Sequence, residues 1–339
     1  MRVISGKYRG KKLISPADSS VRPTTDRIKE TVFNILQARV PDARVLDLFA
    51  GSGALGIECI SRGAREVVFV DSSRTSVELV RQNLKGIEGG FRVVQADFAA
   101  AIRTEKEPFD IVFVDAPYGS GLGEAAVYAV LDRGLLAADG VIAYEHSVNL
   151  PFRPERDDVV TREKIMGTVT VDFVRRKSRA LVTGSFDPVT VAHVAIVEEA
   201  LRQFDEVTVA CLVNPDKEYM FTPEERVALA EAAFADEPRV KVLFSEDAAV
   251  DVAKRENAQA LVRGLRGGEM SDYEEEMAKY NGAHGVETCF VSPDVAPEVS
   301  STAARKALQS GDFRIVPNRA IIELKKILEH KKTKGDAHA

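Results

Sequence analysis

The chain opens a strand, glycine turn and helix unit twice. Residues 45–60 read VLDLFAGSGALGIECI, and residues 180–197 read ALVTGSFDPVTVAHVAIV. In each stretch an apolar run of strand length meets a glycine turn and then the start of a helix, which is the usual opening of a nucleotide-binding α/β domain. Because no internal repeat makes the two halves copies of each other, we predict two different nucleotide-type sites.

The length and the order of the apolar runs agree with two domains. The chain has 339 residues, and a domain usually takes about 100–200. Strand-length runs alternate with helix-like stretches in both halves, which predicts parallel sheets covered by helices. The period-two run at residues 167–176 predicts an antiparallel strand that closes the first sheet. We therefore expect two doubly wound α/β domains, residues 1–177 and 178–330, and a disordered tail over 331–339.

The N-terminus and the cysteines indicate a cytoplasmic protein. The opening residues MRVISGKYRGKK contain no apolar segment of the secretory type. The longest apolar runs are far shorter than the ~20 residues of a membrane span. Cys59, Cys211 and Cys289 are odd in number and widely spaced, so they predict neither a disulfide framework nor a metal cluster.

Charge is distributed unevenly along the chain. The net charge is −6, but residues 1–30 carry +5 and the remainder carries −11. A basic arm on an acidic protein is a candidate for contact with nucleic-acid phosphates. It is equally compatible with a solvated surface arm, and charge alone leaves both interpretations open.

The first glycine turn, GSGALG at residues 51–56, favours one cofactor over another. Its spacing alone also fits dinucleotide enzymes or a simple tight turn. However, Asp47 lies four residues before Gly51, where a carboxylate would repel a pyrophosphate and attract the cationic sulfonium and amino groups of S-adenosylmethionine. Asp71 ends the next strand, where a carboxylate accepts hydrogen bonds from ribose hydroxyls.

The sequence DAPY, residues 115–118, follows a later apolar strand. The carboxyl ends of parallel strands carry the chemistry of such sheets. Methylation of an exocyclic amine requires that the nitrogen lone pair face the methyl group. The Asp115 carboxylate and a backbone carbonyl of the turn could accept the two amine hydrogens, and Tyr118 could stack on the extruded base.

These segments resemble a known family. MRVISGKYRGKKL, RPTTDRIKETVFNIL, DLFAGSGALGIE and VFVDAPY together are similar to the bacterial 16S rRNA guanine-N2 methyltransferases, over residues 1–177. The resemblance implies a Rossmann-like methyltransferase that acts on ribosomal RNA or a small-subunit assembly particle. It implies that S-adenosylmethionine is bound by Asp47, Gly51, Gly53, Asp71 and Asp97. It implies catalytic roles for Asp115 and Tyr118, and an RNA-facing cleft with Arg22, Thr24, Thr25 and Arg27. Ala116 departs from the family, which usually has a proline there.

In the second half, candidate phosphate ligands gather at strand and helix ends. GSFDPVTVAH places Ser185 and His193 around one turn and at one helix N-terminus, which offers free N–H groups and a positive dipole to phosphate. A lone histidine is more often a core or surface residue. Here similar positions are predicted for Lys217, Arg263, Arg266, Ser300, Ser301 and Thr302, which all suit phosphate oxygens.

The order GSFDPxTxxH, NPxK, FTxEER, RGLR and SS resembles phosphopantetheine adenylyltransferase over residues 178–330. The resemblance implies a Rossmann-like nucleotidyltransferase with catalytic His193, a possible homo-oligomer formed through this half, and ATP with Mg²⁺ but no dedicated protein metal site. It assigns 4'-phosphopantetheine to Ser185, Lys217, Ala249 and Arg263. It assigns ATP to Ser185, Phe186, His193, Gly264, Leu265, Arg266, Glu276, Ser300, Ser301 and Thr302. Ala192 stands where the family has glycine.

Two alternatives remain open. Nicotinate-mononucleotide adenylyltransferases and cytidylyltransferases share this superfamily, but they typically have histidine at the position of Thr190 and lack the RGLR run. Alternatively, one half is an inactive binding module, given Ala116 and Ala192. Because every side chain with a proposed chemical role is present, we expect a bifunctional enzyme.

Overall fold

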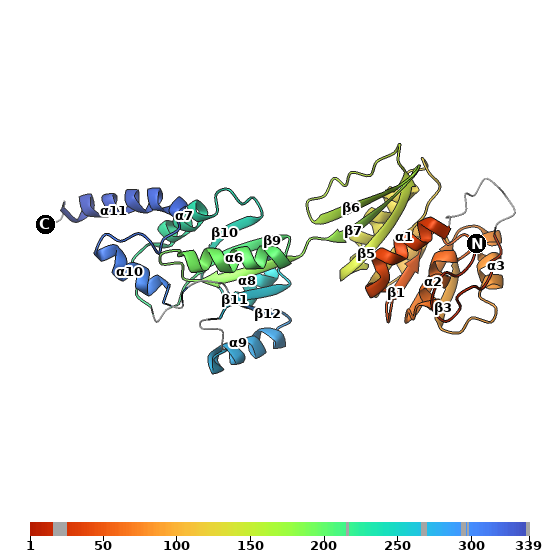
Figure 1. Cartoon of the computed structure of the whole chain (residues 1–339), viewed down its shortest axis with the longest axis horizontal. Helices are drawn as coiled ribbons and strands as arrows, with labels where there is room; N and C mark the ends of the chain where they lie inside the picture. Colours follow the sequence, from red (N-terminus) through yellow and green to blue (C-terminus); the bar gives the residue numbers. More distant parts are fainter. Residues whose placement is uncertain (16–25, 215–216, 266–269, 293–295, 297, 337–339) are drawn as a thin grey trace. The chain divides into compact units, whose positions relative to one another are not determined.

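The computed structural model divides the chain into two compact units, Met1–Arg176 and Lys177–Ala339, which are described separately (Figure 1). It describes all residues except 16–25, 215–216, 266–269, 293–295, 297 and 337–339. Four predicted site residues therefore lie outside the described part of the chain: Arg22, Thr24, Thr25 and Arg266.

The first unit is built around one mixed sheet. Its elements are α1 (Asp26–Leu36), η1 (Gln37–Arg39), β1 (Arg44–Asp47), α2 (Ala54–Ser61), β2 (Glu66–Asp71), α3 (Arg74–Asn83), β3 (Gly90–Gln95), α4 (Phe98–Thr104), β4 (Phe109–Val114), α5 (Leu122–Asp132), β5 (Leu136–Ser147), β6 (Val159–Met166) and β7 (Val169–Arg176). Among the described residues the strand order is β3-β2-β1-β4-β5-β7-β6. The first five strands are parallel, and β7 is antiparallel to β5, as the period-two run predicted. The edge strand β6 was not predicted.

The second unit has an all-parallel sheet in the part of the chain that is described. Its elements are β8 (Arg179–Gly184), α6 (Val191–Gln203), β9 (Glu206–Leu212), α7 (Pro223–Ala233), β10 (Val240–Ser245), α8 (Ala249–Arg255), β11 (Ala260–Gly264), α9 (Asp272–Ala283), β12 (Glu287–Val291), α10 (Ser301–Gln309), η2 (Asn318–Ala320) and α11 (Ile321–Asp336). The strand order is β10-β9-β8-β11-β12. The predicted fold class, two α/β domains with parallel-rich sheets, is confirmed.

Both sheets reverse their winding direction at the first strand of the unit. β1 lies between β2 and β4, and β8 lies between β9 and β11. At such a switch point the loops after neighbouring strands diverge to opposite faces, which leaves a crevice at the carboxyl ends of the strands. The two glycine turns found in the sequence follow β1 and β8, so the topology places each of them at this crevice.

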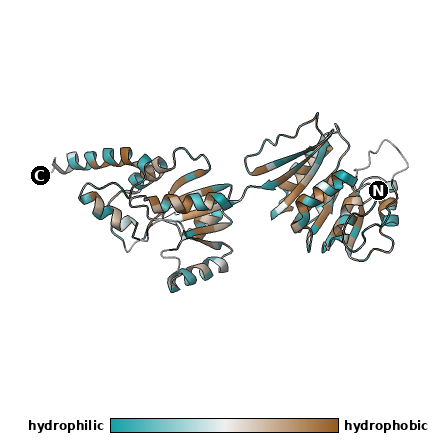
Figure 2. Cartoon of the chain, viewed as in Figure 1, coloured by the Kyte–Doolittle hydropathy of each residue, from teal (hydrophilic) through white to brown (hydrophobic). Residues whose placement is uncertain are grey.

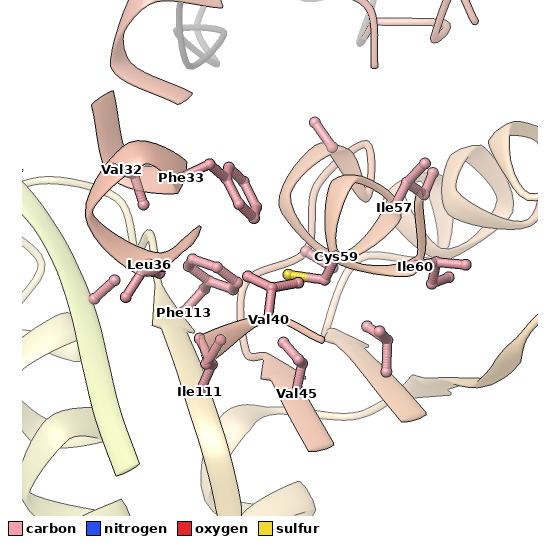
Figure 3. Close-up of a cluster of buried hydrophobic side chains, with 14 of the residues drawn as sticks. Val32, Phe33, Leu36, Val40, Val45, Ile57, Cys59, Ile60, Ile111 and Phe113 are labelled. Atoms are coloured by element: carbon pink, nitrogen blue, oxygen red, sulfur yellow. The ribbon is translucent and has the colours of Figure 1, made fainter. Parts of the chain in front are cut away.

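Apolar side chains from the strands and from the inner helix faces form the core of each unit (Figure 2). In the first unit, Phe33 of α1 packs on Phe113 of β4 with ring centroids 5.8 Å apart, and Ile57 and Cys59 of α2 cover the same face (Figure 3). Each fully buried large apolar side chain stabilises the fold by about 1.5–3 kcal/mol. This packing holds the strand ends rigidly, and the candidate site residues start from them.

The basic arm is part of the fold in its described residues. Val3 and Leu13 are buried in the core, and Arg2 forms an antiparallel bridge with Lys12. The Lys29 Nζ is fully buried, donates to the Arg2 carbonyl at 2.5 Å and pairs with Glu58 Oε2 at 3.1 Å. Glu58 also accepts the backbone N–H of residues 4 and 5. A charged pair inside the core therefore anchors the arm to α1 and α2.

The expected disordered tail requires a correction. We predicted disorder from residue 331, but α11 continues to Asp336. Lys331 explains part of the difference, because its Nζ donates to the Met220 carbonyl at 3.0 Å and pairs with Glu225 Oε2 at 2.8 Å. These contacts tie the last turns of the helix to the start of α7. Residues 337–339 lie outside the described chain.

No helix in the described residues combines the length and the apolar character needed to cross a bilayer.

Candidate functional sites

In the first unit, carboxylates collect at the ends of β1 and β2. Asp47 is the last residue of β1 and Asp71 the last residue of β2, and these strands are neighbours. Asp71 Oδ2 accepts the Gly51 N–H at 2.9 Å, so this carboxylate also holds the glycine turn in place. Its other oxygen accepts the Ser73 N–H at 2.8 Å. The two predicted cofactor carboxylates therefore lie around one turn.

Asp47 has the chemistry of a binding site for a cation. The residue is 2% exposed, and its carboxyl group accepts the Gly56 N–H at 3.1 Å. The pKa of Asp47 is raised to about 7, mainly by burial and also by the charge of Asp71, while the hydrogen bond from Gly56 acts in the opposite direction. A buried carboxyl group with so high a pKa gains most from a cationic partner, which would offset its desolvation. The sulfonium and amino groups of S-adenosylmethionine fit this requirement.

The glycines of the turn have separate reasons. Gly51 and Gly53 have φ values of 53° and 77°, which are left-handed conformations that favour glycine. Gly56 allows a close approach of α2 to β2, because a Cβ there would lie 2.2 Å from the Phe69 ring. The first two glycines shape the turn, and the third one packs the helix on the sheet.

Asp97 begins α4 after β3. Its side chain accepts the Ala100 N–H at 2.8 Å and so caps the helix. The residue is exposed, and its capping bond uses the Oδ1 atom. The predicted contact with an adenine amine would use the other carboxylate oxygen.

The DAPY turn follows β4. Asp115 is half-buried, Ala116 is buried, and the Tyr118 ring is 40% exposed. The Tyr118 hydroxyl donates to Glu145 Oε1 of β5 at 2.7 Å. An exposed ring with a fixed hydroxyl is suited to stack on a base. A small pocket opens beside the turn; it is lined by Ala116, Pro117, Tyr118, Gly119, Gly121, Gly123, Tyr144, Glu145, His146, Ser147 and Leu150.

Two residues of this pocket were not predicted. Glu145 and His146 belong to β5, and the sequence analysis gave them no role. His146 is buried and its Nε2 lies 2.7 Å from Asp172 Oδ2 of β7. Burial lowers the pKa of His146, but the hydrogen bonds to Asp172 and to the Ser147 carbonyl outweigh it and raise that pKa above its ordinary value. Two polar residues directly after an apolar run were the sequence signal that could have identified them.

For the predicted RNA cleft, Arg27 is the residue that the structure describes. It lies exposed in the first turn of α1. Arg9 and Lys12 of the arm are exposed as well, and have no ion pair among the described residues. Lys7 and Lys11 instead contact their own chain, because Lys7 pairs with Glu88 at 2.8 Å and Lys11 Nζ donates to the Lys85 carbonyl at 2.6 Å.

In the second unit, His193 lies in the first turn of α6, three residues after the N-cap Thr190. The Thr190 N–H donates to His193 Nδ1 at 3.0 Å. Because Nδ1 accepts this bond, it carries no proton, and the neutral ring must carry its proton on Nε2. The ring packs on Phe186, with centroids 4.6 Å apart. The helix N-terminus thus presents an oriented N–H donor.

Contacts between distant segments bring α10 to this turn. The Ser301 hydroxyl donates to the Pro188 carbonyl at 3.0 Å. Arg305 Nη1 donates to the carbonyl and to Oδ2 of the buried Asp187, at 2.7 and 3.1 Å, and Arg305 Nη2 donates to Thr302 at 3.2 Å. Ser300 caps α10. The predicted ATP residues of both segments are therefore side by side.

The remaining predicted residues occupy the ends of the other elements. Arg263 and Gly264 end β11, which pairs with β8, and the Leu265 N–H donates to the Val291 carbonyl at 2.8 Å. Lys217 is exposed after β9, and Ala249 begins α8. Glu276 is exposed on α9 and has no hydrogen bond or ion pair with the other candidates in the described chain.

The sequence analysis quoted Arg226 as part of the FTxEER motif but assigned it no role in holding this site together. Arg226 of α7 is 1% exposed, and its Nη1 donates to the carbonyls of Ser185 and Leu212 at 2.9 and 3.1 Å. Its guanidinium lies 4.3 Å from the Tyr219 ring centroid. Arg226 therefore joins the ends of β8 and β9. Within the described residues, no group of three or more His, Cys, Asp or Glu side chains is placed to hold a metal ion.

Comparisons with known proteins match the two units separately. Residues 1–175 match the family described as Conserved hypothetical protein 95, and residues 181–307 match the one described as Cytidylyltransferase-like. The ribosomal RNA small subunit methyltransferase D of Escherichia coli K12 is 37% identical over 53% of this chain and 91% of its own length. The Haemophilus influenzae protein of the same name is 31% identical over 50% and 91%. A phosphopantetheine adenylyltransferase of Phocaeicola vulgatus is 40% identical over 39% of this chain and 89% of its own length.

Proposed function

We propose a two-part function for this chain. Its first half belongs to the family of the ribosomal RNA small subunit methyltransferases. Its second half belongs to the cytidylyltransferase-like family and has a phosphopantetheine adenylyltransferase as a relative. The first half transfers a methyl group to the N2 amine of a guanine in 16S rRNA. The second half transfers AMP from ATP to 4'-phosphopantetheine, which yields dephospho-coenzyme A and pyrophosphate.

For methyl transfer, S-adenosylmethionine supplies the electrophilic methyl group. Asp47, Gly51, Gly53, Asp71 and Asp97 would hold it. Asp115 and a carbonyl of the DAPY turn accept the amine hydrogens, and the exposed Tyr118 ring stacks on the base. The N2 lone pair then forms the N–C bond, the electrons of the C–S bond stay on sulfur, and the proton that the nitrogen loses passes to the Asp115 carboxylate that accepts its hydrogen bond. Catalysis is positioning, because the amine is held with its lone pair toward the methyl carbon.

The buried Asp47 is the observation that carries this half of the proposal. A dinucleotide pyrophosphate beside it would add negative charge to a carboxyl group that is already costly to ionise. A cationic cofactor does the opposite. The Ala116 substitution removes no polar group, since the backbone carbonyl remains.

For adenylyl transfer, the Nε2–H of His193 is the observation that supports the mechanism. A phosphopantetheine phosphate oxygen attacks the α-phosphorus of ATP, and the bond to pyrophosphate breaks. His193 donates to an α-phosphate oxygen, where charge develops. Ser185, Lys217, Ala249 and Arg263 bind phosphopantetheine. ATP is bound by Ser185, Phe186, Gly264, Leu265, Arg266, Glu276 and the residues 300–302. Mg²⁺ bound to ATP would neutralise part of the charge on its phosphates.

Thr190 and Arg263 favour phosphopantetheine over other acceptors. Thr190 is fully buried, and its backbone N–H orients His193. Unlike the histidine that nicotinate-mononucleotide adenylyltransferases and cytidylyltransferases typically have at this position, it offers no imidazole to the triphosphate. Nicotinate mononucleotide and CTP-dependent substrates remain the alternatives. We also propose a homo-oligomer formed through the second half, which light scattering of the purified chain would test.

A two-substrate assay of the full chain tests the proposal. Unmethylated small-subunit RNA and assembly particles are incubated with S-adenosylmethionine, and the RNA is digested to nucleosides for mass spectrometry. In parallel, the chain is incubated with ATP and either 4'-phosphopantetheine or nicotinate mononucleotide. A third sample contains CTP and choline phosphate. We expect N2-methylguanosine from the first assay and dephospho-coenzyme A as the main product of the second. A different methylated nucleoside, or preference for another acceptor, would refute the corresponding half.

A further inference from the structure

His146 lies at the end of β5, beside the pocket next to the DAPY turn, and the mechanism above does not use it. β5 and β7 are antiparallel, with Tyr144 opposite Asp172 and His146 opposite Thr170. Opposite residues of paired strands lie on the same face of the sheet, and their diagonal neighbours are within reach. The His146 Nε2 meets Asp172 Oδ2 in this way, at 2.7 Å. This contact therefore joins the end of β5 to β7.

The imidazole of His146 lies between two oxygen atoms. Its Nε2 faces Asp172 Oδ2, and its Nδ1 lies 3.0 Å from the Ser147 carbonyl. A carbonyl can only accept, so Nδ1 must carry a proton and donate it. The other contact needs a second proton, on Nε2 or on the carboxyl group. The pair formed by His146 and Asp172 therefore holds one proton more than a neutral histidine beside a carboxylate. If this proton leaves, two lone pairs face each other in one of the two contacts.

Asp172 depends on this histidine. Both side chains are buried, with 4% of His146 and 1% of Asp172 exposed. The second oxygen of the carboxyl group, Oδ1, has no hydrogen-bond partner in the part of the chain that the structure describes. A buried carboxylate needs an opposite charge and donated hydrogen bonds to offset its desolvation. Since His146 supplies both, loss of the extra proton leaves a buried charge without its compensation.

The groups around His146 favour its protonated form. Burial lowers the pKa of His146, but the hydrogen bonds to Asp172 and to the next carbonyl, together with the charges of Asp172 and Glu163, raise it above 6.5. Glu163 lies opposite Asp172 on β6. The Tyr144 ring packs 5.0 Å from the imidazole, and its own pKa is raised above 10 by burial and by the charges of Glu124 on α5 and of Asp172. The pair therefore releases its extra proton only as the pH rises above 6.5.

The end of β5 also supports the DAPY turn. Glu145, directly before His146, accepts the Tyr118 hydroxyl at 2.7 Å. In the proposed methyl transfer the Tyr118 ring stacks on the base. We propose that His146 is a positioning residue that makes methyl transfer depend on pH: while the pair with Asp172 keeps its extra proton, the end of β5 holds Tyr118 in place, and loss of the proton loosens this support. This inference rests on the proposed methyl transfer.

The test is the pH profile of methyl transfer by the full chain, at saturating RNA and S-adenosylmethionine. Saturation removes the effect of Asp47 on cofactor affinity, which runs in the opposite direction. From about pH 6.5 to about pH 8.5 we expect kcat of the wild type to fall at least ~fivefold, because one buried hydrogen bond is lost. His146→Gln is neutral at every pH, so its kcat should be lower at the acidic end and nearly constant across this range. A residue with only a structural role would lower the active fraction and leave the shape of the profile unchanged.

NMR measures the titration directly. In a chain labelled with ¹⁵N in its histidine rings, His146→Gln identifies the signal of His146, the one histidine in residues 1–176. The midpoint of its titration should lie above pH 6.5. Asp172→Asn keeps an oxygen that can accept the Nε2–H but removes the charge, so it should move the titration and the fall in kcat to lower pH. This variant also serves if His146→Gln does not fold. His284→Gln, the same change at an exposed histidine of the second unit, should leave the profile of methyl transfer as it is.

The outcomes are distinct. A wild-type chain that forms no N2-methylguanosine at any pH overturns the proposed function, and this inference with it. If the wild type forms that product, the inference alone is overturned by a kcat that does not fall across this range, or by a fall that persists at the same pH in His146→Gln or Asp172→Asn. A titration midpoint of His146 at or below pH 6.5 overturns it as well.

Discussion

Asp47 carries a buried carboxyl group whose pKa of about 7 lies above the ordinary value of 3.8. Between these two pH values the folded chain keeps a proton that the unfolded chain has lost. The contribution of Asp47 to the free energy of unfolding is therefore fully present below about pH 4 and is lost as the pH rises through 7. A cationic ligand reverses this balance, because it favours the ionised form.

The first prediction concerns Asp47→Asn, which is neutral at every pH. Without ligand, the wild-type chain should lose unfolding free energy relative to the variant as the pH rises from 4 to 7, by about 1.4 kcal/mol per pH unit at most. With ligand, S-adenosylmethionine affinity should rise with pH through 7 in the wild type. It should be at least ~tenfold weaker and nearly independent of pH in Asp47→Asn. Thermal unfolding and calorimetry at several pH values measure both effects. Equal affinities at pH 8 would contradict the assignment of Asp47.

At the scale of elements, Arg226 joins α7 to the ends of two strands. Removal of its guanidinium leaves the carbonyls of Ser185 and Leu212 without their donor in a buried place, at a cost of about 1–3 kcal/mol. Lysine keeps the charge but neither the planar fork nor the stacking on Tyr219. Arg226→Lys should therefore destabilise the second unit and raise the KM for phosphopantetheine, because the segments that carry Ser185 and Lys217 lose their common support.

Chemical unfolding and steady-state kinetics check this prediction. Arg202→Lys provides the matched control, since Arg202 is 74% exposed and pairs only with Glu199 among the described residues. That change should stay within about 0.5 kcal/mol. If Arg226→Lys behaves like the control in both measurements, Arg226 does not position the site.

The arm gives another prediction at this scale. The anchor formed by Lys29 and Glu58 leaves Lys12 on the surface, whereas the Lys11 Nζ is engaged with the Lys85 carbonyl. Lys12→Glu should therefore weaken RNA binding without unfolding the arm, and should reduce the slope of log K against log salt by about 1. Lys106→Glu, an exposed site before β4 with the same charge change, should leave the slope as it is. Equal slopes for the two variants would show that the arm does not contact phosphate.

At the scale of the molecule, each unit holds its own set of candidate residues. Asp115 lies in Met1–Arg176 and His193 in Lys177–Ala339. Asp115→Ala should abolish methyl transfer and leave dephospho-coenzyme A formation unchanged. His193→Ala should lower adenylyl transfer by ~10²–10³-fold, since one oriented donor is lost, and leave methyl transfer unchanged. Both activities are measured on each purified variant. Loss of both activities from a single change in a folded protein would indicate one composite site.

Local patterns in the sequence determined the order of strands and helices, the two glycine turns and the residues next to them. The places of Asp47, Asp71, Asp115 and His193 in the fold were predictable, because each lies at the end of a strand or in the first turn of a helix close to its motif. The antiparallel β7 was predictable from its period of two, whereas β6 was not, because its residues 162–165 are all exposed and its sequence has no alternation.

Only the tertiary structure decided which distant residues support these motifs. Arg305 and Asp187 are 118 residues apart in the chain, Tyr118 and Glu145 are 27 apart, and Lys29 meets Glu58 inside the core. A charged residue in a sequence looks the same whether it is exposed or buried. Its cost when buried, and therefore its partner, depends on the packing of strands that the chain brings together over long separations. For that reason the positions of the candidate residues at strand and helix ends could be predicted from the sequence, while the contacts that orient them could not.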